Sequence, residues 1–159
     1  MAIPKTVRDG KITLKDGAAN TLIIAYEGEG NFSFDGAGEK ASRLTLMDRG
    51  TIVGCRKEND QVVTASFSVN MCEFTDSSAG SPIDFIMKTN AYSGNTSTGG
   101  ANFSDFYMID VSYVSDGTAH GEPDKEVVIA KCIGTYEFSE GFPNIVTFNF
   151  ECYGGITRT

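Results

Sequence analysis

The sequence contains no tryptophan, a single histidine (His120) and no long apolar run. A histidine-dependent triad would have to use His120, and no G-x-S-x-G motif supplies a nucleophile. The absence of tryptophan weighs against a sugar-binding β-sandwich, which usually displays exposed aromatic platforms. No stretch approaches the ~20 apolar residues of a membrane-spanning helix. We therefore expect no enzymatic activity and no membrane span.

Basic residues are scarce, because 13 Lys and Arg face 21 Asp and Glu and give a net charge of −8. This balance weighs against ordinary nucleic-acid binding, which needs Lys and Arg to neutralise phosphates, and against adhesion to anionic membranes. The N-terminal segment MAIPKTVRDGKITL lacks the apolar core of a signal peptide, so we expect synthesis in a cytoplasm. The length of 159 residues suits a single domain, which we place at residues 1–159.

The cysteines lack metal-binding spacing, since none forms a C-x-x-C pair and each lies in a predicted strand. The four are Cys55, Cys72, Cys132 and Cys152. We favour four reduced, mostly buried thiols, while a disulfide or a zinc site stays open.

Acidic clusters give weak signals for chemistry. One cluster around His120 holds side chains that could gather around a cation, but its loop lacks the residue order of a calcium loop. Its members are Asp116, His120, Glu122 and Asp124. Glu137 and Glu140 flank a predicted turn, where solvated surface acids are far commoner than a catalytic pair. We expect no metal and no cofactor, with His120 an exposed loop residue.

Most of the chain alternates apolar and polar residues with the period of a β-strand. In QVVTASFSVNMCEF (61–74), one face is apolar and the other is small, mostly neutral and hydrogen-bonding. The segment 144–155 repeats this two-faced pattern, which is typical of a sheet with one face on a core and one in water. The predicted strands are 11–17, 21–27, 31–35, 43–48, 51–57, 61–74, 106–114, 125–141 and 144–155.

One helix is predicted at about 81–90. Ser81 can cap its N-terminus, Pro82 suits the first helical position and Asp84 lies near the positive end of the dipole. We expect roughly two to three turns packed on a sheet. The fold class is mainly β, a β-sandwich or strongly bent barrel of antiparallel strands with one short flanking helix.

Pairing and loops follow from the turn signals. Residues 51–57 lead through ENDQ into residues 61–74, so we expect these two segments to form a hairpin. The second is longer, so part of it needs a partner elsewhere in the fold or on a neighbouring subunit. The segments 35–43 and 91–105 are predicted to be mobile polar loops.

The motifs also occur in a recognisable order. A short N-terminal strand ends in KDG, a DRG break at Asp48–Gly50 precedes TIVGCRKENDQVVTASFSV, and the capped helix SPIDFIMK precedes YEFSEGFPNIVTFNFECYGG. This order resembles that of the major tail tube protein of tailed bacteriophages, whose architecture also appears in contractile-injection and type VI secretion tubes. The resemblance spans nearly the whole chain.

The resemblance implies a structural virion protein. Its subunits would form stacked hexameric rings whose long strands join into a continuous barrel. The tube would house a tape measure protein and conduct DNA without binding it specifically. Tail terminator and baseplate proteins are further expected partners, and the expected location is the virion tail after synthesis in a bacterial host. The alternatives are a capsid decoration or baseplate protein, or a lectin-like binding module.

Within that resemblance, two sets of residues become candidates. A lumen wall would offer DNA no positive charge and little bulk. Its candidate residues are Thr64, Ser66, Ser68, Asn70, Thr147, Asn149 and Glu151. Contacts between rings would come from the two polar loops, with Asp35, Glu39, Lys40, Arg43, Asn95, Asn102 and Asp105 as candidates. A plain solvent-exposed face or loop is the competing interpretation for each set.

Overall fold

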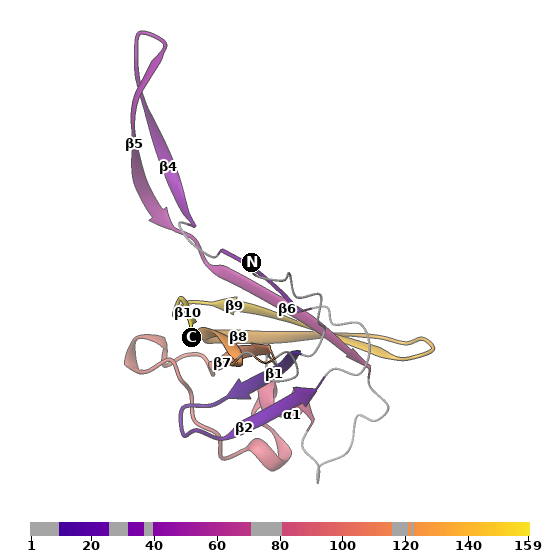
Figure 1. The fold of residues 1–159 in the computed structure, drawn as a ribbon. Helices are drawn as coiled ribbons and strands as arrows, with labels where there is room; N and C mark the ends of the chain where they lie inside the picture. Colours follow the sequence, from indigo (N-terminus) through magenta and orange to yellow (C-terminus); the bar gives the residue numbers. More distant parts are fainter. Residues whose placement is uncertain (1–9, 26–31, 37–39, 71–80, 116–120, 122) are drawn as a thin grey trace.

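The structure is a computed structural model that describes residues 10–25, 32–36, 40–70, 81–115, 121 and 123–159 (Figure 1). These residues form ten strands, one short α-helix and two 3₁₀ helices. The elements are β1 (Gly10–Lys15), β2 (Thr21–Ala25), β3 (Ser33–Asp35), β4 (Ala41–Asp48), β5 (Thr51–Asp60), β6 (Val63–Asn70), α1 (Pro82–Met87), η1 (Asn90–Tyr92), η2 (Ala101–Phe103), β7 (Ile109–Ser115), β8 (Lys125–Ser139), β9 (Ile145–Cys152) and β10 (Ile156–Arg158).

Eight of these strands form one antiparallel sheet in the order β2-β1-β7-β8-β9-β6-β3, with β10 also pairing with β8. The long strand β8 pairs with β7 through its first half and with β9 through its second half. Near the change, Lys131 adopts a positive φ of 56°, and its backbone N–H donates to the Asp110 carboxylate at 3.0 Å. The register between β7 and β8 shifts at this point, as in a β-bulge, which bends a strand.

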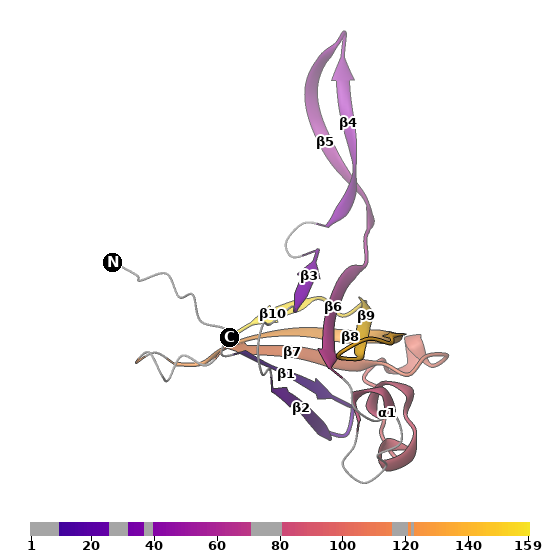
Figure 2. The same ribbon diagram turned by 90° about the vertical axis from the view of Figure 1, so that its right-hand side faces the viewer.

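The predicted fold class is confirmed: the chain is mainly antiparallel β with a single short helix, in a sandwich-like arrangement (Figure 2). One core joins both halves of the sheet. It takes Ile12 and Leu14 from β1, and Phe67 from β6 packs against Phe148 and Phe150 with ring centroids 5.1 and 5.7 Å apart. The apolar positions of the alternating segments therefore face inward, as their period predicts.

Helix α1 is shorter than the predicted 81–90 but begins as expected. The Ser81 hydroxyl accepts the backbone N–H of Asp84 at 3.4 Å, and Pro82 occupies the first helical position. Phe85 and Ile86 are buried against the sheet. The helix ends at Met87 because Lys88 adopts a left-handed φ of 55°.

The predicted hairpin between residues 51–57 and 61–74 is wrong. Strand β5 pairs with β4, and this two-stranded sheet projects away from the rest of the molecule (Figures 1 and 2). Arg49 and Gly50 link the two strands with φ values of 47° and 84°. Two consecutive positive φ angles define a type I′ turn, whose twist matches that of a hairpin.

Strand β6 pairs instead with β9 along its whole length and with β3 at Thr64–Ser66. It runs from Val63 to Asn70, which is shorter than the predicted 61–74, and residues 71–74 lie outside the described residues. From the sequence, part of this segment is expected to pair with a strand elsewhere in the fold or on a neighbouring subunit. That partner is β9 of the same chain, more than seventy residues away.

The prediction of mostly buried cysteines is wrong for Cys55, which is exposed on β5. Cys132 and Cys152 are buried free thiols at partnered positions of β8 and β9, and Cys72 lies outside the described residues. The difference follows from the projecting hairpin, whose strands have no core on either face.

Candidate functional site: a concave polar face

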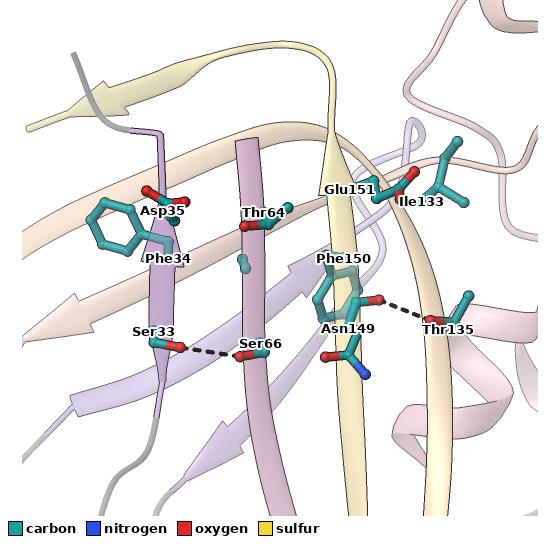
Figure 3. A pocket seen from close by; sticks show the side chains of 11 residues that line it. Ser33, Phe34, Asp35, Thr64, Ser66, Ile133, Thr135, Asn149, Phe150 and Glu151 are labelled. Atoms are coloured by element: carbon teal, nitrogen blue, oxygen red, sulfur yellow. Dashed lines mark hydrogen bonds between the residues drawn. The ribbon is translucent and has the colours of Figure 1, made fainter. Parts of the chain in front are cut away.

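The outward face of β3, β6, β9 and β8 carries rows of polar side chains, with the apolar Ile133 beside Glu151. In one cross-strand row, Ser33 lies opposite Ser66, Ser66 opposite Asn149, and Asn149 opposite Thr135. The Ser33 and Ser66 hydroxyls lie 3.1 Å apart, and the Thr135 hydroxyl donates to the Asn149 carbonyl at 3.4 Å (Figure 3). One hydroxyl pair and one hydroxyl-to-backbone bond therefore link neighbouring strands across this face.

Two further rows flank this one. On one side, Thr64 stands between Asp35 and Glu151. On the other, the Ser68 and Thr147 hydroxyls lie 3.0 Å apart. Strand alternation puts these rows on the same face because each lies two residues from the first.

The first two rows surround a hollow of about 480 Å³ (Figure 3). Its lining carries two carboxylates, Asp35 and Glu151, and no lysine, arginine, histidine or cysteine. Hydroxyl, amide and apolar groups make up the rest. This lining therefore has no cationic side chain to pair with a phosphate. The lining residues are Ser33, Phe34, Asp35, Thr64, Ala65, Ser66, Ile133, Thr135, Asn149, Phe150 and Glu151.

The structure brings the two predicted polar rows of β6 and β9 together in register on one face. Four of the seven candidate lumen residues line the hollow, namely Thr64, Ser66, Asn149 and Glu151. Sequence reasoning missed the contribution of β8, although Thr135 alternates with the core-facing Gly134 in the same way. That these residues line a channel stays a prediction.

The candidate residues of the loop 35–43 lie in three different settings. Asp35 belongs to β3 and its carboxylate pairs with the Lys40 ammonium at 3.1 Å. Arg43 belongs to β4 in the projecting hairpin. Glu39 lies outside the described residues. The segment is thus a junction between the main sheet and the hairpin.

The segment 91–105 contains η2 and part of η1 and has internal anchors. Asn102 and Asp105 are exposed, whereas Asn95 is buried. The Asn95 side chain donates to the Tyr107 hydroxyl at 3.1 Å and accepts from the Asn20 amide at 3.5 Å. Asn95 therefore holds the segment in place, and only the exposed pair has side-chain surface to offer a neighbouring copy.

The strongest anchor is Asp16, which is only 2% exposed. Its carboxylate accepts backbone N–H groups from Thr96 at 3.0 Å, Asn20 at 2.7 Å and Ala18 at 3.0 Å, and the Asn20 amide at 2.9 Å. Burial raises the pKa of this carboxyl, but the hydrogen bonds together outweigh it and hold the pKa below its usual value. A charged carboxylate thus ties the β1–β2 turn to the loop after η1.

The described residues include no group of three or more His, Cys, Asp or Glu side chains placed to hold a metal ion. In the suggested cation cluster, Asp116, His120 and Glu122 lie outside the described residues, so that idea is untested. No helix in the described ranges is long and apolar enough to span a membrane.

Comparison with known proteins gives a likeness of fold. No protein-family model matches the chain, and no curated protein sequence does. Among solved structures, a chain of the "anti-feeding prophage (AFP) baseplate, 6-fold symmetrised" superposes with a TM-score of 0.60. The fold resembles that of a prophage baseplate chain. The match covers 100% of this chain and 97% of the other at 9% identity, so it shows a common fold and no more.

Proposed function

We propose that this chain is a structural virion protein that assembles into stacked hexameric rings forming a phage tail tube. The observation that carries the proposal is the concave polar face of β3, β6, β9 and β8, whose hollow has two carboxylates and no cation. Support comes from the likeness to a chain in a six-fold symmetrised prophage baseplate, because a ring needs the same face from every subunit.

In such a ring the polar faces of six copies would surround a channel. Acidic and neutral side chains repel or ignore the DNA phosphates, so the genome slides through without being held. Before ejection, the same wall would enclose the tape measure protein. Tail terminator and baseplate proteins would cap the two ends, and the protein would reside in the tail of the virion.

The test is electron microscopy of the purified, concentrated protein. We expect hollow rings or tubes. A chain that remains monomeric at every concentration, and also in the presence of its tail partners, would contradict the proposal.

A baseplate component is the second candidate, because the described structural neighbour belongs to a baseplate. Gold-labelled antibodies on intact particles separate the two. Any sheath is first stripped from the tail so that antibodies can reach the tube. A tube protein is then labelled along the whole length of the tail, whereas a baseplate protein is labelled only at the distal end.

A further inference from the structure

Two buried cysteines lie directly opposite each other on neighbouring strands of the main sheet. Cys132 of β8 pairs in register with Cys152 of β9, and the two residues are 0% and 2% exposed. Both belong to the core, where Ile109 and Val63 complete the same cross-strand row. Neither thiol belongs to the polar face, so the proposed function gives this pair no role.

The backbone hydrogen bonds show which kind of antiparallel pair the two cysteines form. The Tyr153 N–H donates to the Lys131 carbonyl at 3.0 Å, so this bond joins the residues that flank the cysteines. That pattern defines a non-hydrogen-bonded pair, in which the Cα atoms lie about 4.5 Å apart and the side chains are close. Disulfides bridge Cα atoms about 4.4–6.8 Å apart, so this position suits one.

The two thiols also interact with each other. A hydrogen bond with the Cys152 thiol and burial both raise the pKa of the Cys132 thiol. The Cys132 thiol also donates to the Ile129 carbonyl at 3.2 Å. Cys55, in contrast, is exposed on β5 and lies opposite Thr45. Among the cysteines in the described ranges, only Cys132 and Cys152 are therefore placed to join.

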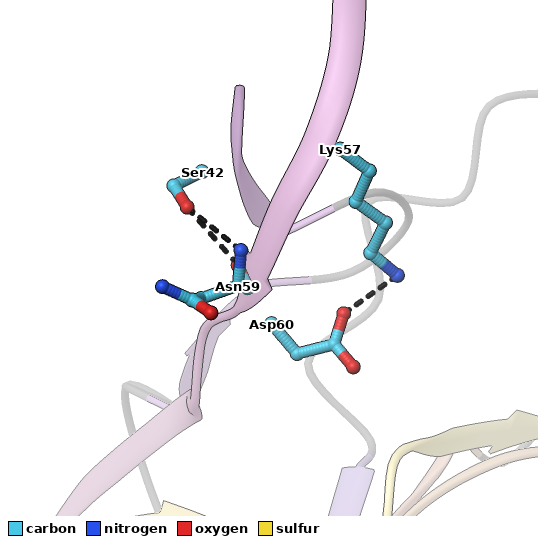
Figure 4. Close-up of polar contacts among 4 residues, drawn as sticks. All are labelled: Ser42, Lys57, Asn59 and Asp60. Carbon is cyan, nitrogen blue, oxygen red and sulfur yellow. Dashed lines mark hydrogen bonds and ion pairs between the residues drawn. The ribbon is translucent and has the colours of Figure 1, made fainter. Parts of the chain in front are cut away.

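A hollow of about 690 Å³ reaches this pair from outside. Its wall includes Cys152 and, from the base of the projecting hairpin, Lys57 and Asp60. The Lys57 ammonium pairs with the Asp60 carboxylate at 2.6 Å (Figure 4). Beside them the Asn59 N–H donates to the Ser42 hydroxyl at 2.9 Å, and both contacts hold the hairpin side of the hollow. The hollow has room for an oxidant little larger than water.

We propose that Cys132 and Cys152 are a redox site that hydrogen peroxide converts into a cross-strand disulfide. Cys152 reacts first, because it lies in the wall of the hollow and at the end of β9, whereas Cys132 is fully buried.

The reaction balances in two steps. The Cys152 sulfur takes one oxygen atom from the peroxide, which releases water and leaves a sulfenic acid. The Cys132 sulfur then attacks the Cys152 sulfur, the S–S bond forms, and the hydroxyl group leaves with the Cys132 proton as a second water. Two thiols lose two electrons in total, and the peroxide oxygens gain them.

The bond fixes one corner of the sheet. Cys132 lies beside the point where β8 changes its partner from β7 to β9, and the chain after Cys152 turns back to pair with β8 through β10. A covalent link here restricts the unfolded chain and so stabilises the fold. Cytoplasmic thiols are kept reduced, so we expect the bond to form outside the cell. That setting rests on the proposed function, because a virion leaves its host, but the chemistry does not.

Two variants with two cysteines each test the proposal. The test variant is Cys55→Ser with Cys72→Ser, which keeps only Cys132 and Cys152. The matched control is Cys72→Ser with Cys152→Ala, which keeps one cysteine on β5 and one on β8. Thermal unfolding of the reduced forms confirms that each is folded. The unchanged chain is treated in the same way, so that the link is also sought without any substitution.

The folded proteins are freed of reductant and treated with hydrogen peroxide. Mass spectrometry measures the change in mass, and digestion without reductant locates linked peptides. We expect the test variant to lose two hydrogen atoms and to yield peptides joined through Cys132 and Cys152. Its unfolding midpoint should rise by about 5–10 °C, and dithiothreitol should reverse the rise. The control should form no link within the chain.

Thiols that persist at every peroxide concentration that leaves the fold intact, or that gain oxygen without joining, overturn the proposal. A linked protein with an unchanged midpoint overturns the stabilising role of the bond. None of these results depends on assembly. A chain that forms the disulfide but no rings would overturn the proposed function alone.

Discussion

Asp16 shows how one side chain organises a loop far away in sequence. Its carboxylate joins the β1–β2 turn to Thr96 through hydrogen bonds to backbone and side-chain donors. The KDG turn was visible in the sequence, but the reach to residue 96 was not, because a turn motif specifies only local partners. The same holds for Asn95. Its position in a segment rich in Gly, Ser, Thr and Asn predicted an exposed loop residue, but its side chain is buried.

Asp16→Asn should destabilise the fold by about 1.5–3 kcal/mol, since hydrogen bonds to a charged group are lost. The lowered pKa of Asp16 means that its contribution is present above the unfolded value of about 3.9 and is lost as pH falls through the folded value. Denaturant unfolding from pH 7 to pH 2 should therefore show a shallower pH dependence in the variant. Asp35→Asn, at an exposed carboxylate, serves as control, and equal effects of the two substitutions would contradict this account.

The described cysteines should differ sharply in reactivity. Cys55 is exposed, whereas a hydrogen bond with the Cys152 thiol and burial both raise the pKa of Cys132. Because the thiolate is the reactive form, maleimide at pH 7 should modify Cys55 within minutes and leave Cys132 and Cys152 untouched until the protein unfolds. Mass spectrometry in a Cys72→Ser background measures this, with Cys55→Ser as control. Rapid labelling of Cys132 in the folded protein would be evidence against the described core.

At the scale of elements, alternation and capping predicted the strands and the helix well. The inward positions of β6 and β9 are buried as their period requires, and Ser81 caps α1. Strand partners were harder. The segment ENDQ (58–61) is interpreted from sequence as a hairpin turn, but its first three residues belong to β5, and the turn of the hairpin is Arg49–Gly50. Pairing depends on tertiary contacts such as β6 with β9, which no local pattern contains.

The docking of α1 on β8 depends on the small size of Gly134. A Cβ atom there would lie 2.7 Å from Ile86 Cγ2 and 2.8 Å from Phe150 Cε1. Gly134→Val should therefore cost about 1–3 kcal/mol of unfolding free energy by overpacking. Gly54→Ala on β5 is the control, because its Cβ would meet only the Leu46 side chain, 3.5 Å from Cδ1 and 4.0 Å from Cβ, which is ordinary van der Waals contact. Chemical denaturation compares the two, and an unchanged midpoint for Gly134→Val would refute close packing of the helix.

At the scale of the whole molecule, one sheet carries a core on one side and a hollow lined by polar and apolar side chains on the other. Composition and alternation predicted an outer face of small, mostly neutral, hydrogen-bonding side chains. The structure adds that β3 and β8 extend this face. The projecting hairpin could not be foreseen, because its alternation is indistinguishable from that of a strand inside the sheet. Whether this face meets solvent or a channel depends on how other copies of the chain are arranged around it. The alternation pattern of one chain carries no information on that arrangement.

Ser66→Lys together with Ser68→Lys should leave folding nearly unchanged, because both side chains lie on the polar face. If that face lines the channel, the added lysine side chains would bind the DNA phosphates. This would impair genome ejection or assembly around the tape measure protein. Plaque counts measure the defect, with Lys11→Arg as a charge-neutral control. Full infectivity of the double variant would remove these residues from the lumen.

The most direct test of the central claim is a cryo-electron microscopy reconstruction of the assembled protein. We expect six-fold rings with Thr64, Ser66 and Asn149 facing the central channel. A ring whose channel is lined by another face, or a particle without a channel, would contradict the account.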